Sequence, residues 1–225
     1  MSATVEKITY TSTPEQVAAM HAAFDRALEE VEAGFSRTYP MVIDGDERQA
    51  ASTFETRAPA NRDLLLGRFQ SGTRQDVDDA VAAARAAFAA WSGTDWRERV
   101  RIRRAAELVR ERKFVISSIL VHECGKNRVE AIGEVEEAAD MIDAYTAQME
   151  EHDGFVTELG SLDPGERNRS VLRPFGVWAV LAPFNFPFAL SLGMSSGALL
   201  AGNTVVYKPA SATPISGFEL QRIWA

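Results

Sequence analysis

Two short apolar runs near the C-terminus, with a longer apolar segment between them, form the clearest pattern in the chain. The first run covers 177–182, and the second covers 204–207. Uninterrupted apolar runs of this length are typical of strands buried on both faces of a parallel sheet. The segment 188–200 is long enough for about three helical turns, and Gly202 follows it as a helix C-cap should. The pattern therefore predicts a strand–helix–strand unit with parallel strands and a right-handed crossover.

Upstream of this unit, hydrophobic positions recur at helical spacing in several segments, each with a start or stop signal. Helices are predicted from Thr13 to about Ala33, from Thr73 through Trp91, from Asp95 onward, over 114–124, and over about 129–151. Period-two patterns predict strands at 41–43, 53–56 and 64–69, with a turn at Asp44-Gly45. Glycine, proline and charged residues dominate 154–170, which we interpret as a hairpin.

The composition is that of an ordinary globular protein, with 46% hydrophobic and 25% charged residues among 225. The net charge of −8 disfavours a nucleic-acid partner, because such partners select basic surfaces. No apolar run reaches the ~18 residues of a membrane span, and the polar N-terminus does not resemble a signal peptide. A single cysteine cannot form an internal disulfide and fits a reducing cytoplasm. The three histidines have no metal-ligand spacing.

Each predicted strand of the C-terminal unit is followed by a loop that carries candidate chemistry. In open parallel sheets, ligands bind beyond the carboxyl ends of the strands. The first loop contains Asn185 between two prolines, and its side-chain NH2 is an uncharged donor. A fixed donor aimed at a developing alkoxide lowers a barrier by ~2.7–4 kcal/mol. The second loop begins with Lys208, a cation that can reach a ribose hydroxyl or a phosphate.

A simpler structural role exists for each of these residues. On residue type alone, Asn185 is expected to cap the helix that begins near Pro187. Lys208 can be a solvated lysine at a strand end, and Ser211 can cap the helix that starts around Thr213. These alternatives stay open when the residues are considered one by one.

Taken together, the two loops resemble those of the aldehyde dehydrogenase superfamily. The matching residues are PFNFP at 183–187, GNTVV at 202–206 and Lys208-Pro209. Within the superfamily the chain looks most like the 1-pyrroline-5-carboxylate dehydrogenases. The resemblance runs upstream to about Tyr39 and covers less than half of the family's usual length.

The resemblance implies NAD(P)-dependent oxidation of L-glutamate γ-semialdehyde to glutamate in proline catabolism. Asn185 would stabilise the tetrahedral oxyanion that forms when a thiolate attacks the aldehyde, and Lys208 would bind the adenosine ribose. The cofactor would be NAD, with NADP possible because Ser211 replaces a glutamate that would repel a 2′-phosphate. The other implied contacts are Leu181, Ala182, Pro183 and Phe184 for the cofactor, and Glu137 and Phe186 for the aldehyde substrate. For both Glu137 and Phe186 a structural role is an open alternative, and Glu137 can equally be an exposed charge of an acidic helix.

The implied fold is α/β: a truncated Rossmann-like parallel sheet of the aldehyde dehydrogenase fold, with a helical N-terminal region and a β-hairpin. We expect a helical extension at 1–38 and the N-terminal part of the cofactor-binding domain at 39–151. A bridging hairpin at 152–172 and the first βαβ unit at 173–225 would follow. The family uses such a hairpin for oligomerisation, so the full-length form is expected to be a homo-oligomer.

Cys124 is the only cysteine, but it lies far upstream of the position of the family's nucleophile. We interpret it as a small buried side chain. The resemblance would place the nucleophile and the glutamate base after Ala225, so the isolated 225 residues are expected to be inactive. The alternatives are another semialdehyde dehydrogenase, or an inactive fragment that serves as a binding or assembly module.

Overall fold

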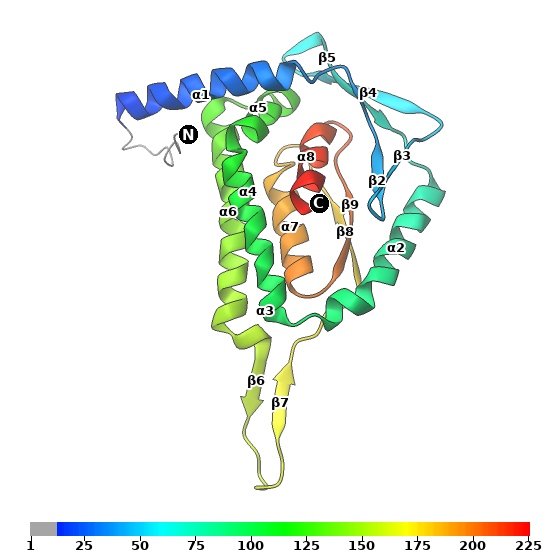
Figure 1. Ribbon diagram of the computed structural model, residues 1–225, viewed down its shortest axis with the longest axis vertical. Coiled ribbons are helices and arrows are strands. Elements are labelled where there is room, and N and C mark those ends of the chain that lie inside the picture. Colours follow the sequence, from blue (N-terminus) through cyan, green and yellow to red (C-terminus); the bar gives the residue numbers. More distant parts are fainter. Residues whose placement is uncertain (1–12) are drawn as a thin grey trace.

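The strand–helix–strand unit lies at the centre of the computed structural model, which describes residues 13–225 (Figure 1). Its strands are β8 (Val177–Leu181) and β9 (Thr204–Lys208), and helix α7 (Ala189–Leu200) joins them. The strands pair in parallel, with Leu181 opposite Lys208 at their carboxyl ends. The predicted parallel unit is therefore confirmed, and α7 starts one residue later than the pattern suggests.

Strand β8 is less buried than its apolar sequence predicts. Val180 is buried, but Trp178 is 48% and Leu181 is 66% exposed. Helix α7 packs on both strands and α2 (Arg74–Gly93) packs mainly on β9, so the two-stranded sheet lies between these helices (Figure 1). The prediction of a strand buried on both faces is wrong for β8, because Trp178 and Leu181 point to opposite faces of the sheet and both are exposed.

The starts of α1 and α2 follow local capping signals. Helix α1 (Pro14–Glu32) begins with a capping box, in which Oγ1 of Thr13 accepts a hydrogen bond from the Gln16 N–H at 3.3 Å. Helix α2 begins with the same arrangement between Thr73 and Asp76. These reciprocal bonds satisfy backbone groups that the helix cannot pair itself, and both predicted starts are confirmed. Residues 1–12 of the predicted extension lie outside the described residues.

The segment after Asp95 begins with short helices and continues into longer ones. The Asp95 carboxylate accepts from the Arg97 N–H at 2.8 Å and caps the first piece, as predicted. Gly125, with a φ of +72°, ends the helix that precedes it, because glycine adopts this left-handed conformation freely. The helices of this region are α3 (Trp96–Arg99), the 3-10 turn η1 (Val100–Ile102), α4 (Arg103–Glu111), α5 (Lys113–Cys124) and α6 (Arg128–Glu151).

Helix α6 is the axis of the main hydrophobic core. Its residues Val135, Ala139 and Ile142 are fully buried, and their cluster draws side chains from α1, α4, α5, α7 and α8 (Pro214–Trp224). The predicted apolar stripe of α6 is buried except at Tyr145, which is exposed. Burial of this area fixes α7 and α8 against α5 and α6.

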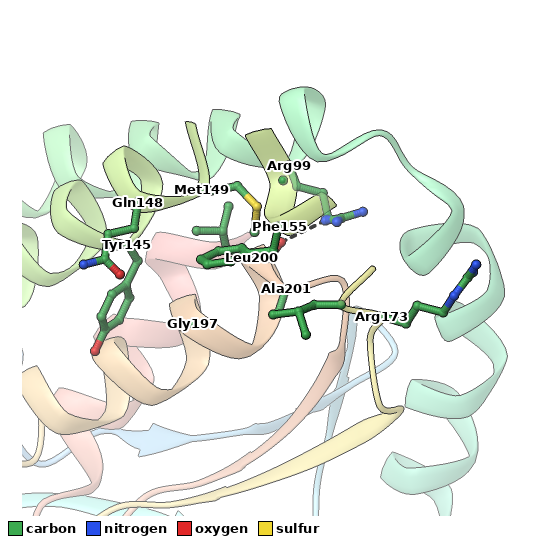
Figure 2. A pocket seen from close by; sticks show the side chains of 11 residues that line it. Arg99, Tyr145, Gln148, Met149, Phe155, Arg173, Gly197, Leu200 and Ala201 are labelled. Carbon is green, nitrogen blue, oxygen red and sulfur yellow. Dashed lines mark hydrogen bonds between the residues drawn. The ribbon is translucent and has the colours of Figure 1, made fainter. Parts of the chain in front are cut away.

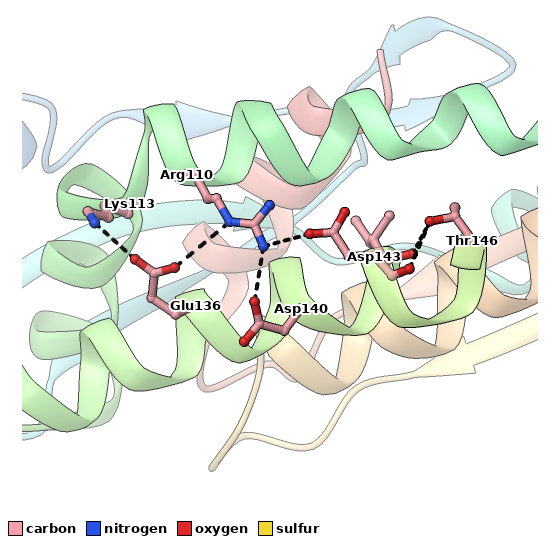
Figure 3. A network of polar contacts seen from close by, with 7 residues as sticks. Arg110, Lys113, Glu136, Asp140, Asp143 and Thr146 are labelled. Carbon is pink, nitrogen blue, oxygen red and sulfur yellow. Dashed lines mark hydrogen bonds and ion pairs between the residues drawn. The ribbon is translucent and has the colours of Figure 1, made fainter. Parts of the chain in front are cut away.

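A polar network joins α4 and the start of α5 to α6 (Figure 3). The Arg110 guanidinium lies 3.0 Å from a carboxylate oxygen of Asp140 and 2.7 Å from one of Asp143. Lys113 and Glu136 form a second pair, with 2.9 Å between Nζ and Oε1, and both side chains are largely buried. Some charged residues of the acidic helix α6 thus form ion pairs with α4 and α5, and others are exposed to solvent.

Short strands surround this core. A three-stranded sheet has the order β1–β5–β4, with β4 and β5 antiparallel, and its strands are β1 (Thr38–Tyr39), β4 (Thr53–Ala58) and β5 (Asn61–Gln70). Strands β2 (Met41–Ile43) and β3 (Asp46–Arg48) form a hairpin at the predicted Asp44-Gly45 turn, where both residues have positive φ.

A second hairpin projects from the body of the molecule (Figure 1). The turn η2 (Asp153–Phe155) leads into β6 (Val156–Leu159), which pairs antiparallel with β7 (Asn168–Val171). The predicted hairpin is therefore present. In residues 13–225, no helix combines the length and the apolar character that crossing a membrane demands.

Candidate functional site

The loops after β8 and β9 lie side by side at the carboxyl end of the sheet. We call residues 182–188 the β8 loop and residues 209–213 the β9 loop. The Ala182 N–H donates to the carbonyl oxygen of Lys208 at 3.2 Å, so the ladder continues to the point where the loops begin. The structure therefore brings Asn185 and Lys208 to the same edge, as the strand pattern predicts.

Asn185 is exposed in the β8 loop, and its side chain forms no hydrogen bond within residues 13–225. It does not cap α7. The N–H groups of Phe188 and Ala189 instead donate to Oε1 of Glu134, at 2.9 and 3.1 Å. The capping alternative for Asn185 is therefore wrong, and its amide is available to a ligand.

The β8 loop rests on the junction between α5 and α6. Nζ of Lys126 lies 3.7 Å from the ring centroid of Phe186, a cation–π contact, and it also pairs with Glu134. The Cys124 thiol lies 3.6 Å from the carbonyl oxygen of Phe184. The residues on both sides of Asn185 are thus held by side chains from a distant segment.

Lys208, the last residue of β9, and Ser211 of the β9 loop are both exposed to solvent. Nζ of Lys208 donates to the carbonyl oxygen of Pro209 at 3.0 Å. Ser211 does not cap α8, because the N–H groups of Ile215 and Ser216 donate to the carboxylate of Glu123. The capping alternative for Ser211 is wrong.

The exposed groups at this edge suit a dinucleotide. Leu181 and Phe184 are each 66% exposed, and Ala182 and Pro183 between them are half-buried. Such apolar side chains cover a ring or a sugar, while the Lys208 ammonium supplies charge-assisted hydrogen bonds to hydroxyl or phosphate oxygens. The residues present fit a nucleotide on this edge. Within residues 13–225, no group of three or more histidine, cysteine or acidic side chains is arranged to hold a metal ion.

Glu137 differs from the two glutamates beside it. Glu134 and Glu136 are buried and paired with lysines, whereas Glu137 is exposed on α6. Phe186 is also exposed, at 40%. Both side chains are thus accessible to a substrate, and their roles stay predictions.

Cys124 is not an activated nucleophile. Burial and the neighbouring carboxylates of Glu123 and Glu134 raise the pKa of its thiol to about 12, although the Lys126 ammonium acts in the opposite direction. A thiol with this pKa carries almost no thiolate at neutral pH, and the thiolate is the reactive form. The interpretation of Cys124 as a packing residue agrees with its half-buried position.

A cavity of about 260 Å³ lies at the opposite end of α7 from the β8 loop. Figure 2 shows Leu200 and Ala201, from the carboxyl end of that helix, together with Tyr145 and Met149 of α6 around it. It contains none of the predicted site residues, so it does not contribute to the strand-edge site.

Sequence reasoning missed the two buried glutamates that hold these loops. Two signals were available. The N-cap residue of α7 is Phe188, whose side chain cannot accept a hydrogen bond, and the side chain of Thr213, the N-cap residue of α8, does not cap that helix. Both helices therefore need an acceptor from elsewhere in the chain. Glu134 also falls on the buried face of α6, where an unpaired acid would be costly.

The comparisons with known proteins point to one family. The sequence matches the aldehyde dehydrogenase family over residues 46–225. It is 39% identical over 203 residues to the 1-pyrroline-5-carboxylate dehydrogenase of Geobacillus thermodenitrificans, a match that covers 89% of this chain and 39% of that protein. The protein of the same name from Staphylococcus saprophyticus is 35% identical over 207 residues, with the same coverage.

Solved structures give the same result. A 1-pyrroline-5-carboxylate dehydrogenase superposes with a TM-score of 0.88 at 32% identity, over 97% of this chain and 42% of that one. A Thermus 1-pyrroline-5-carboxylate dehydrogenase with bound NAD gives a TM-score of 0.85 at 33% identity, with equal coverage.

Because the match extends over most of its length, the chain belongs to the aldehyde dehydrogenase family. The predicted family and α/β fold are confirmed. Its similarity is to proteins named 1-pyrroline-5-carboxylate dehydrogenase, and the chain spans 39% of the length of the two curated relatives given above.

Proposed function

We propose that these residues form the cofactor-binding and oxyanion-binding part of an NAD-dependent aldehyde dehydrogenase. The observation that carries the proposal is the parallel register of β8 and β9, which sets the Asn185 loop beside Lys208. The names of the relatives favour L-glutamate γ-semialdehyde as the substrate and glutamate as the product.

Asn185 is the catalytic residue that this chain contributes. As a thiolate attacks the aldehyde carbon, the carbonyl oxygen gains negative charge, and the Asn185 NH2 donates a hydrogen bond to it. The donor is already free of other partners within residues 13–225, so it does not have to reorganise during the reaction.

NAD, when bound, supplies the hydride acceptor. Lys208 binds the adenosine ribose, and the residues before Asn185 line the cofactor, namely Leu181, Ala182, Pro183 and Phe184. Ser211 carries no charge, so a 2′-phosphate meets no repulsion there and NADP is also accepted. Glu137 and Phe186 contact the aldehyde substrate, with Glu137 attracting its amino group.

The chain alone has no dehydrogenase activity under this proposal. The reaction needs a cysteine thiolate, and the pKa of Cys124, raised to about 12, keeps its thiol protonated. Activity therefore belongs to a longer enzyme that contains these residues. A single half-buried thiol fits a reducing compartment, and we assign the enzyme to the cytoplasm.

The β6–β7 hairpin is the proposed contact between subunits of a homo-oligomer. Its exposed leucines, Leu159, Leu162 and Leu172, would be covered by a second copy. Within residues 13–225 the outer edges of β6 and β7 pair with no other strand, so they offer backbone groups to a partner strand.

Two substitutions in the longer enzyme test the proposal. Asn185→Ala should lower kcat ~10²–10³-fold, because one oxyanion donor is lost, while NAD affinity stays the same. Lys208→Met should do the reverse, weakening NAD binding with a smaller effect on kcat. Steady-state kinetics with the aldehyde and an NAD titration measure both. An Asn185→Ala enzyme that is folded and fully active would contradict the proposal.

A further inference from the structure

The backbone of the β8 loop has little support of its own. Pro183 and Pro187 have no N–H to donate. The backbone N–H and C=O of Asn185 form no hydrogen bond with the backbone of any other residue in 13–225. The carbonyl oxygen of Phe186 accepts from the Leu190 N–H at 3.3 Å, which is a long bond. The position of the Asn185 amide therefore depends on what the loop rests upon.

Glu134 holds the loop from its C-terminal side. It is 2% exposed, and its Oε1 accepts from the N–H groups of Phe188 and Ala189 at 2.9 and 3.1 Å. Phe188 is itself fully buried and is three residues from Asn185. The carboxylate satisfies two donors that α7 cannot pair, and it does so from α6, more than fifty residues earlier in the sequence.

Lys126 connects this anchor to the residue next to Asn185. Its ammonium pairs with Oε2 of Glu134 and lies 3.7 Å from the centroid of the Phe186 ring. Its side chain is only 12% exposed, so both contacts act where water screens them little. One cation thus links the cap of α7 to the aromatic side chain that immediately follows Asn185.

We infer that Lys126 and Glu134 are positioning residues for Asn185. Together they fix the β8 loop, and so the direction of the Asn185 amide, before the substrate arrives. Neither side chain contacts the reacting atoms, and their effect on catalysis passes through the loop. The inference rests on the proposed oxyanion role of Asn185.

The test compares kcat and KM of the longer enzyme with those of Lys126→Met, Lys126→Arg and Glu134→Gln variants. Lys126→Met should lower kcat ~10- to 10²-fold and leave KM for NAD unchanged, because displacing a catalytic group by ~1 Å lowers the rate by up to ~10²-fold. Arginine keeps the charge and stacks on aromatic rings, so Lys126→Arg should recover most of the loss. Glu134→Gln should resemble Lys126→Met.

The matched control is the other buried lysine–glutamate pair of α6, Lys113 and Glu136. Its side chains are 11% and 10% exposed, and its separation is 2.9 Å, but Glu136 bonds to no residue of the β8 loop. Lys113→Met should lower the melting temperature by about as much as Lys126→Met does, since each removes one partner of a buried lysine–glutamate pair. It should leave kcat within ~2-fold of the unmodified enzyme.

The double variant Asn185→Ala/Lys126→Met separates positioning from general damage. If Lys126 acts through Asn185, adding Lys126→Met to Asn185→Ala should lower kcat by less than ~2-fold, because residues that act as a unit are not additive. A further ~10-fold loss in the Asn185→Ala background, or an equal loss of kcat in Lys113→Met, would overturn the inference.

A readout that does not depend on activity keeps the two hypotheses apart. Hydrogen exchange of residues 182–189 in the 225-residue chain should speed up in Lys126→Met and not in Lys113→Met. Unchanged exchange in Lys126→Met overturns the positioning inference, whatever the enzyme does. An unmodified longer enzyme that does not oxidise the aldehyde contradicts the proposed function, even where exchange responds as expected.

Discussion

The β8 and β9 loops are anchored by the same device with different electrostatics. Each loop leads into a helix whose first N–H groups donate to a buried glutamate from another helix. For α7 the acceptor is Glu134 of α6, and for α8 it is Glu123 of α5, with 2.8 Å between its Oε2 and the Ser216 nitrogen. Both loops are thus tied to the helical core rather than to the sheet alone.

The difference lies in the counter-charge. Glu134 is paired with Lys126, whereas Glu123 forms no ion pair within residues 13–225. Burial raises the pKa of Glu123 to about 8, against the hydrogen bonds from Ser216 and Ile215, which favour the charged form. The loop assigned to catalysis is therefore held by a glutamate that is paired with a lysine. The loop assigned to the nucleotide is held by a group whose charge changes near neutral pH.

The largest expected effect comes from truncating the two anchors. Glu134→Ala leaves the Lys126 ammonium buried without its partner, and breaking such a pair costs ~3–5 kcal/mol of unfolding free energy. Glu123→Ala leaves two unpaired N–H groups but no orphan charge, and should cost less, ~1–3 kcal/mol. Urea denaturation of the 225-residue chain at neutral pH measures both. Equal losses would remove the distinction between the two anchors.

The pH dependence of stability should differ between the unmodified chain and Glu123→Gln. Between pH 4.5 and about 8, the folded protein holds a proton on Glu123 that the unfolded chain releases. Raising the pH through this window therefore favours unfolding, at most ~1.4 kcal/mol per pH unit, and the effect levels off above pH 8. Glu123→Gln should flatten this slope in urea melts from pH 5 to 9. The same slope in both proteins would show that Glu123 does not titrate as described.

A smaller effect is expected from the packing of α8 on the β9 loop. A Cβ added at Gly217 would lie 2.5 Å from Cβ and 2.9 Å from Cγ of Pro209, both in a rigid ring next to Lys208. Gly217→Ala should therefore displace this loop, cost ~1–3 kcal/mol of stability and weaken NAD binding.

Gly133 provides the control for this substitution. It lies in α6, where an added Cβ would meet nothing within 4 Å. Gly133→Ala should stabilise the chain by ~0.5–1 kcal/mol, because alanine favours the helix. If Gly217→Ala stabilised the chain as Gly133→Ala does, the close contact between Gly217 and Pro209 would not determine the position of the β9 loop.

The parts of the fold that could be predicted from sequence are those set by neighbouring residues. The capping boxes at Thr13 and Thr73, the glycine stop at Gly125 and the turn at Asp44 all depend on residues within a few positions of each other. Their chemistry is therefore visible in the sequence itself.

The anchors could not be predicted in the same way, because they join distant segments. Glu134 and Glu137 are three residues apart on one acidic helix, yet the first is buried beneath the β8 loop and the second faces solvent. Only the packing of α6 against α7 distinguishes them. The exposure of β8 was missed for a related reason, since an apolar run does not reveal how much of a strand other elements of the fold cover.

The exposed Trp178 of β8 gives the protein an internal fluorescent reporter. Trp178 is 48% exposed on that strand, whereas the other three tryptophans, Trp91, Trp96 and Trp224, are half-buried. The indole N–H groups of Trp91 and Trp224 also donate to the carbonyl oxygen of Leu199 and to the Ser195 hydroxyl. Iodide should therefore quench mainly Trp178 emission. Any polypeptide that packs against Trp178 should shift that emission to shorter wavelengths and shield it from the quencher, so assembly at this strand can be followed without a label.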